Sequence, residues 1–316
     1  MAEVVKKATR QAYGDALAEL GAKYDKLVVL DADLAKATMT ITFKNAFPER
    51  FFDCGIAEAN LMGVAAGLST EGFIPFASTF AMFAAGRAFE QVRNTIGYPH
   101  LNVKIGATHA GVSVGEDGAT HQCNEDIALM RTIPGMTIIN PADYVEAKAA
   151  VEAAINYNGP VYLRFGRLAC PIFNDESTYK FELGKGITLK DGTDVTIIAT
   201  GLMVNEAVEA AKLLEKDGIN ARVINIHTIK PLDTELVIKA AKETGAIVTA
   251  EEHSIIGGLG GAVAETVCEV CPVPVVRLGN YDTFGKSGPA VELLKYFGLT
   301  AEKIAEKAKQ AVSLKK

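Results

Sequence analysis

The chain has few cysteines, no long hydrophobic run and no basic block, and each absence excludes a class of protein. Five cysteines among 316 residues are too few for a disulfide framework and favour a reducing compartment. No apolar run approaches the length that spans a bilayer. The net charge is −6, which argues against a nucleic-acid surface. The first seven residues have neither an apolar core nor a cleavage site, so we expect no signal peptide and a cytoplasmic protein.

The chain does contain a regular alternation of helical and strand patterns. With 49% hydrophobic and 22% charged residues, it has the composition of a globular protein with ample core. At roughly 150 residues per domain, its length suggests two domains. In the first half, strands are predicted at residues 26–30, 51–53, 73–77, 101–107, 136–139 and 160–165. Helices are predicted between them, at residues 8–22, 57–68, 79–96 and 124–132 and after Pro141. This β-α alternation favours a parallel sheet covered by helices on both faces.

The alternation stops between residues 170 and 193, where proline, glycine and acidic residues interrupt it. This segment is predicted to be a linker with at most short strands. Strand patterns then return, and we expect a second, smaller α/β domain. The expected division is a first domain over residues 1–170, a linker over 171–193 and a second domain over 194–316.

The loop over residues 115–122, with the sequence GEDGATHQ, is the most informative segment. It follows a predicted strand, and ligands of open α/β sheets gather at the carboxyl ends of strands. His109 precedes the loop, which itself contains Asp117 and His121. Two histidines flanking two acids and two glycines favour a functional loop over a structural one. A zinc site is possible in principle, but the spacing matches no established ligand pattern.

Three further features have both a functional and a structural interpretation. Glu58 begins an apolar helix after Gly55, so it is either a solvated acid favoured by the helix dipole or a partly buried carboxyl that shares a proton with a ligand nitrogen. Phe80 and Phe83 are three residues apart on a predicted helix and, taken alone, indicate ordinary core. The Cys268-x-x-Cys271 pair has no partner pair, so a redox or metal site is not expected there.

Residues 51–167 resemble the pyrimidine-binding domain of transketolases, and the second half resembles the transketolase C-terminal domain. The loop sequence GEDGATHQ is highly specific to that family, whereas the turn at residues 55–58 is shared more widely among thiamine diphosphate enzymes. The second match rests on residues 251–253, 257–260 and 279–288. The resemblance implies an α/β fold with a parallel-sheet pyrimidine-binding domain, followed by a smaller C-terminal α/β domain.

The resemblance implies thiamine diphosphate and Mg²⁺ as cofactors. The family's Mg²⁺ motif is Gly-Asp-Gly followed by a distant asparagine, and residues 116–118 with Asn140 imitate it poorly. The chain is therefore similar to the C-terminal subunit of a split transketolase. An N-terminal partner subunit would supply the Mg²⁺ and diphosphate site, and this chain would be inactive or nearly so alone. A homodimer within an α2β2 complex is expected by analogy.

The resemblance also assigns roles on the cofactor side of the site. Glu58 falls where the family's glutamate hydrogen-bonds the aminopyrimidine ring, and His121 falls near the reacting carbonyl. Phe80 and Phe83 match aromatic residues that pack against the pyrimidine, which reverses their interpretation as core. Asp33 matches an acid close to the cofactor. Glu58 and His121 are therefore the expected catalytic residues.

On the substrate side, the resemblance implies that sugar phosphates bind and that a two-carbon ketol unit passes from a ketose phosphate to an aldose phosphate. Asp117 matches the aspartate that contacts a sugar hydroxyl. Arg10, His109 and Arg167 match residues that hold the terminal phosphate, for which arginine offers paired donors. No metal ligand is assigned to this chain.

Four alternatives stay open on the sequence. The chain could be a 1-deoxyxylulose-5-phosphate synthase-like enzyme, although those sequences usually have alanine at the position of Glu116. It could resemble the beta subunit of a 2-oxo-acid dehydrogenase, which shares the turn before Glu58 but lacks the GEDG loop. It could be a transketolase relative for branched or sulfonated sugars. It could also be a non-catalytic scaffold subunit, against which the intact set of candidate residues argues.

Overall fold

A seven-stranded sheet forms the framework of the first half of the chain. The computed structural model describes residues 5–315, and the sheet has the strand order β12-β6-β7-β5-β4-β2-β3. The strands are β2 (Leu27–Asp31), β3 (Phe51–Asp53), β4 (Ile74–Phe80), β5 (Lys104–Thr108), β6 (Thr137–Ile139), β7 (Val161–Arg164) and β12 (Thr228–Lys230). All neighbouring pairs are parallel except β12 with β6. The carboxyl ends of the parallel strands therefore meet at one edge of the sheet.

Helices cover both faces of this sheet, which explains why its central strands are continuous apolar runs. On one face, α1 (Thr9–Gly21) and α7 (Tyr144–Asn156) pack in one buried cluster with residues of β2, β4 and β7. On the other face, α4 (Glu58–Thr70) and α6 (Asp126–Arg131) pack in a second cluster. Further short elements of this half are α2 (Ala35–Thr38), α3 (Ile41–Ala46), η1 (Pro48–Arg50) and η4 (Val112–Val114).

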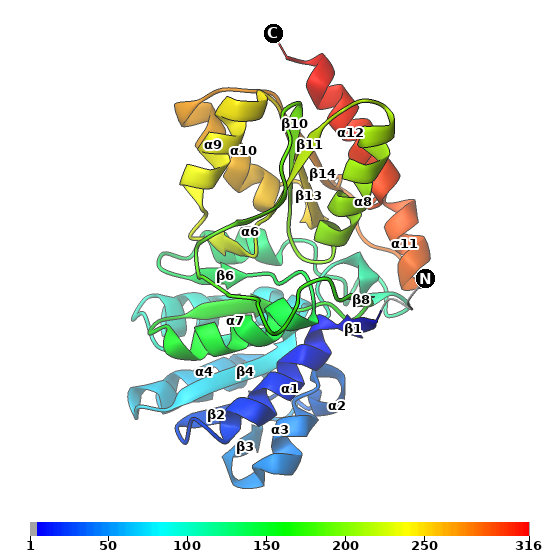
Figure 1. Ribbon diagram of the computed structural model, residues 1–316. Helices are drawn as coiled ribbons and strands as arrows, with labels where there is room; N and C mark the ends of the chain where they lie inside the picture. The colour runs from blue at the N-terminus through cyan, green and yellow to red at the C-terminus, as the bar shows by residue number, and fades with distance from the viewer. Residues whose placement is uncertain (1–4, 316) are drawn as a thin grey trace.

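A five-stranded sheet with the order β14-β13-β10-β11-β9 forms the second half. Its strands are β9 (Ile187–Lys190), β10 (Val195–Ala199), β11 (Ala221–Asn225), β13 (Ile247–Ser254) and β14 (Val275–Asn280). Figure 1 shows α8 (Met203–Lys216) and α12 (Ala301–Ser313) on one side of this sheet, and α9 (Thr234–Thr244) and α10 (Leu259–Val270) on the other. A fifth described helix of this half, α11 (Ala290–Tyr296), follows β14. The predicted α/β class with two parallel-sheet units is confirmed.

Part of the predicted linker is ordered strand. Residues Ala169–Pro171 form β8, which pairs antiparallel with β1 (Lys6–Ala8). Residues Ile187–Lys190 form β9, the antiparallel edge of the second sheet. The expectation of at most short strands agrees with these lengths. No helix within residues 5–315 is both long and apolar enough to cross a bilayer.

The helix predicted over residues 79–96 is wrong in its first two residues and in its regular α-helical form, although residues 81–97 are helical apart from a turn at Ala88. Strand β4 continues to Phe80, which pairs with Thr108 of β5. Two π-helical turns then follow, η2 (Phe83–Arg87) and η3 (Val92–Gly97), with α5 (Phe89–Gln91) between them. The parallel ladder with β5 therefore overrides the helical spacing of the phenylalanines. Such widened turns occur frequently at functional sites.

Strand β12 is a second feature that the sequence did not predict. It follows β11 in the second half of the chain, yet it forms the edge of the first sheet, antiparallel to β6. Lys230 donates from Nζ to the carbonyls of Arg131 (2.8 Å) and Ile133 (2.6 Å). Three residues are too few to give a recognisable strand pattern. The short strand nevertheless links the two halves, because it follows β11 of the second sheet and pairs with β6 of the first.

Gly106 of β5 offers a test of this packing. A Cβ atom there would lie 2.1 Å from the hydroxyl of Tyr13 on α1. Tyr13 cannot withdraw, because it is fully buried, bonded to Ser78 (2.6 Å) and stacked on Phe165. We predict that Gly106→Ala lowers the free energy of unfolding by about 2–3 kcal/mol in urea denaturation. The control Gly166→Ala, whose Cβ would meet only Thr9 Oγ1 at 3.8 Å, should change it by less than about 0.5 kcal/mol. Equal losses would contradict this packing.

Candidate functional site

The candidate site lies at the edge where the parallel strands end. Asp33 follows β2, Phe80 ends β4, and His109 follows β5 directly. Arg167 follows β7. The backbone N–H of Arg10 on α1 donates to the carbonyl of Gly166, the residue before Arg167, at 3.3 Å. Residues far apart in sequence therefore meet because the strands run parallel, as the general rule for ligand sites in α/β sheets requires.

Two phenylalanines and two histidines form an aromatic cluster at the centre of this edge, here defined as Phe80, Phe83, His109 and His121. The ring of Phe80 stacks on His109 with centroids 3.8 Å apart and lies 5.8 Å from Phe83, nearly parallel to it. His121 meets Phe83 edge-on at 5.4 Å. Phe83 is only partly buried. The rings therefore form a stacked apolar layer with imidazole nitrogens beside it, and Phe83 is more exposed than Phe80, which is 6% exposed.

Glu58 stands at the first position of α4 and is only 2% exposed. The interpretation of Glu58 as a solvated acid at a helix start is therefore wrong. Its Oε2 accepts a hydrogen bond from Arg87 Nη1 at 2.9 Å. The guanidinium of Arg87 also lies over the Phe83 ring, 4.4 Å from its centroid. Glu58 is thus joined to the aromatic cluster through one arginine.

Sequence reasoning missed Arg87. The available signal was its position four residues after Phe83 and on the same helical face. That signal is weak, because the segment Phe83–Arg87 is a π-helical turn and the spacing of a π-helix differs from that of an α-helix.

Arg10 and Arg167 bring positive charge to the His109 side of the aromatic cluster. Arg10 Nη1 lies 3.2 Å from His109 Nε2 and donates to the Ala37 carbonyl at 2.7 Å. Arg167 Nη1 lies 3.6 Å from Asp117 Oδ1 and 3.7 Å from Glu116 Oε2. The structure thus pairs Arg10 with His109 and Arg167 with Asp117, and the charges of both arginines act on His109.

His109 is neutral in this environment. Burial, together with the nearby Arg10 and Arg167 charges, lowers the pKa of His109 to about 3. Because an arginine can only donate, Nε2 must accept from Arg10, and Nδ1 then carries the hydrogen that it donates to Thr108 Oγ1 (2.9 Å). This chain of contacts fixes both the tautomer and the ring orientation of His109.

Asp33 lies apart from this set. It is exposed, has a positive φ of 59°, and its N–H donates to Asp53 Oδ1 at 3.1 Å. Among the described residues it makes no hydrogen bond, ion pair or ring contact with the other predicted site residues. The fully buried Asp31 at the end of β2 organises this loop by accepting from Thr38, Thr40 and the Leu34 N–H. Burial raises the pKa of Asp31 to about 6.

The donor set fits an aromatic ligand ring better than a metal ion. Within residues 5–315, no three His, Cys, Asp or Glu side chains are gathered as metal ligands. The stacked layer of Phe80 and Phe83, with the buried Glu58 carboxyl near it, suits a planar nitrogen heterocycle. A diphosphate–Mg²⁺ group finds no such fit in the described part of this chain.

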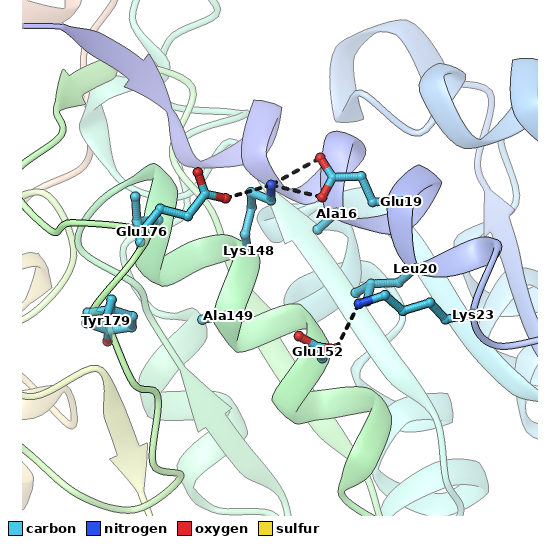
Figure 2. A pocket seen from close by; sticks show the side chains of 10 residues that line it. Ala16, Glu19, Leu20, Lys23, Lys148, Ala149, Glu152, Glu176 and Tyr179 are labelled. Atoms are coloured by element: carbon cyan, nitrogen blue, oxygen red, sulfur yellow. Dashed lines mark hydrogen bonds and ion pairs between the residues drawn. The ribbon is translucent and has the colours of Figure 1, made fainter.

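A separate groove lies between α1 and α7, and Figure 2 shows its side chains. Its charges pair with one another. Lys148 contacts Glu19 at 2.9 Å and Glu176 at 3.0 Å, and Lys23 lies 3.5 Å from Glu152. None of the predicted site residues lines it. We assign the chemistry to the strand edge, because the groove offers no unpaired functional group for a ligand.

Comparison with known proteins identifies the family of both halves of the chain. Residues 5–171 match the model of the transketolase pyrimidine binding domain, and residues 184–304 match the transketolase C-terminal domain. A protein of Methanocaldococcus jannaschii, provisionally named a transketolase C-terminal section, is 53% identical over 96% of both chains. A 6-deoxy-6-sulfo-D-fructose transketolase subunit of Clostridium sp. strain MSTE9 is 45% identical over 97% of this chain and 95% of its own.

A solved structure titled split gene transketolase, inactive beta4 tetramer, superposes on the chain with a TM-score of 0.91. The two are 56% identical, and the match covers 98% of this chain and 99% of the other. The family models cover both halves, and these relatives match from one end to the other. The chain therefore belongs to the transketolase family.

Proposed function

We propose that this chain is the C-terminal subunit of a two-chain transketolase. With an N-terminal partner subunit, it transfers a two-carbon ketol unit from a ketose phosphate to an aldose phosphate. The observation that carries this proposal is the buried Glu58 carboxyl beside the aromatic cluster. The end-to-end match to a transketolase C-terminal section and to a split-gene transketolase supports the two-chain arrangement.

On the cofactor side, Phe80 and Phe83 would pack against the pyrimidine ring of thiamine diphosphate, and Glu58 would hydrogen-bond to it. Thiamine diphosphate supplies a centre that stabilises a carbanion when it is bound. Arg87 would have to share or release the Glu58 oxygen that it now holds. Mg²⁺ and the diphosphate would be held mainly by the partner subunit, since the described part of this chain gathers no metal ligands.

On the substrate side, His121 would lie near the reacting carbonyl and Asp117 would contact a sugar hydroxyl. Arg10 and Arg167 would bind the terminal phosphate, with neutral His109 fixed between them as an additional polar contact. Asp33 would lie at the cofactor edge of the site, on the loop that Asp31 organises. A cytoplasmic homodimer within an α2β2 complex is the assembly we propose.

A sulfonated sugar is the second candidate substrate. The observation that favours it is the 45% identity to the 6-deoxy-6-sulfo-D-fructose transketolase subunit over nearly the whole chain. A sulfonate and a phosphate are both tetrahedral anions, so two arginines could bind either one. Both candidates assign the same roles to Glu58 and to the aromatic cluster.

Glu58 tests the proposed chemistry most simply. We predict that Glu58→Gln, assayed with the partner subunit present, lowers kcat by about 100-fold or more, because the amide cannot share a proton with the cofactor ring. Folding should be unchanged by circular dichroism, since Gln keeps an acceptor for Arg87. The control Glu71→Gln, an exposed site at the end of the same helix, should retain full activity. Normal turnover of Glu58→Gln would favour a scaffold subunit instead.

Arg167 tests the position of the phosphate. Arg167→Ala removes a charged donor, so we predict that KM for a phosphorylated acceptor rises about ten- to 100-fold. KM for the same acceptor without its phosphate should change by less than about threefold, because no such contact is lost. Steady-state kinetics with the two acceptors provides the comparison. Equal losses for both would remove Arg167 from the phosphate site.

His109 tests the electrostatics of that site. Because its pKa is lowered to about 3, we predict that its imidazole NMR signals do not titrate between about pH 5 and pH 8, where an ordinary histidine does. A short histidine-containing peptide in the same buffer is the control and should titrate within this range. A His109 midpoint near the usual value of about 6.5 would contradict the burial and the neighbouring charges described here.

A further inference from the structure

The loop over residues 111–122, which carries Asp117 and His121, has only short turn hydrogen bonds of its own. It turns at Gly111, Gly115 and Gly118, whose φ angles are +78°, +89° and +77°. Residues 116, 117, 119 and 120 are exposed. Glycine-rich, exposed backbone has a large conformational entropy. Contacts from outside therefore add to what holds this loop, and two sets of them come from the second half of the chain.

The first set involves Glu252 near the carboxyl end of β13. Its Oε1 accepts a hydrogen bond from the backbone N–H of Ser113 at 2.6 Å. A Cβ atom on Gly111 would lie 2.3 Å from Glu252 Cδ, so the carboxyl packs directly on the loop backbone. Arg164 fixes Glu252 in turn, since its Nη2 donates to the Glu252 carbonyl at 2.9 Å while its Nε pairs with Asp126 at 2.8 Å.

The second set involves Gln122 at the end of the loop, which is only 3% exposed. Its Nε2 donates to the Lys286 carbonyl at 2.8 Å and to the Val112 carbonyl at 3.0 Å. One side chain therefore ties the two ends of the loop to the segment that follows β14.

Two glycines permit this close approach. A Cβ atom on Gly285 would lie 1.6 Å from Gln122 Oε1, and one on Gly118 would lie 2.2 Å from Ser287 Oγ. One of these glycines belongs to the loop and the other to the segment over residues 285–287. A side chain at either position would displace the side chain that now lies there, Gln122 or Ser287.

We propose that Glu252 and the segment over residues 285–287 clamp the catalytic loop, and that Gln122 and Glu252 are positioning residues for Asp117 and His121. The clamp gives the C-terminal domain a specific task in the reaction. Its chemical consequence rests on the proposed function, whereas the clamp itself is a property of this chain alone. A loop fixed before substrate arrives avoids the entropy cost of ordering it during binding.

Hydrogen–deuterium exchange on the full chain tests the clamp without any activity. Gln122→Met keeps the side-chain size but removes the donor to Lys286. The amides of residues 113–121 should then exchange about tenfold faster, the change expected from one lost buried hydrogen bond. Peptides from α4 and β4 should be unchanged. The control Gln310→Met, at an exposed site on α12, should alter no loop amide. Unchanged loop exchange in a folded Gln122→Met chain would overturn the proposal.

A Glu252 pair gives an independent variant should Gln122→Met fold poorly. Glu252→Gln keeps an acceptor for the Ser113 N–H and should show nearly normal loop exchange, whereas Glu252→Met should show the faster exchange. A structural defect would instead speed exchange throughout the chain in both variants, and that result would count against the clamp.

Kinetics with the partner subunit then links the clamp to function. Gln122→Met should raise KM for the aldose phosphate about tenfold and leave the Kd of thiamine diphosphate unchanged, because Glu58, Phe80 and Phe83 lie on other elements. Faster loop exchange in a protein that shows no ketol transfer at all would keep the clamp and reject the proposed function. If Gln122→Met shows normal ketol transfer, unchanged loop exchange and an unchanged KM, the proposed function is kept and the clamp is rejected.

Discussion

The parallel pairing of β4 with β5 is the constraint on which the candidate site depends. It places Phe80 opposite Thr108, and the next residue of each strand leaves the sheet at the same edge. The Phe80 ring can therefore stack on His109 at 3.8 Å. From this stack, contacts lead to His121 and, through Phe83 and Arg87, to Glu58. A change in the register of one strand would separate all of them.

We propose that this site is one part of a larger one that the partner subunit completes. It holds a buried carboxyl, an aromatic surface, two imidazoles and two guanidinium groups, which are the groups needed to bind an aminopyrimidine and an anionic sugar. Within residues 5–315 it gathers no set of metal ligands. The loop over residues 111–122 is held by the second half of the chain through Glu252 and Gln122. The two halves therefore act on a single site, although their sheets are separate.

The sequence predicted most of the strands and the residues of the aromatic cluster, for identifiable reasons. Buried parallel strands are continuous apolar runs, and the GEDGATHQ loop carries its chemistry in a specific local pattern. Arg87, β12 and the π-helical turns after Phe80 could not be predicted in the same way. Each depends on packing between distant segments. Phe80 is in a strand because β5 pairs with it, and β12 is a strand because β6 offers it an open edge.

The charged contacts between the halves were also beyond sequence reasoning. Glu252 was noticed only as part of a family match, since nothing in its local pattern shows that its carboxyl meets the Ser113 backbone 139 residues away. The burial of Glu58 had two interpretations on the sequence, and only the structure separates them. Asp33 remains a prediction, because its contacts are with Asp53 rather than with the rest of the site.

Turnover of defined sugar donors by this chain mixed with an N-terminal transketolase subunit tests the central claim most directly. The account predicts steady transfer of a two-carbon unit from xylulose 5-phosphate to ribose 5-phosphate by the mixture, and little or none by either chain alone. Turnover with pyruvate as the only accepted donor would contradict it.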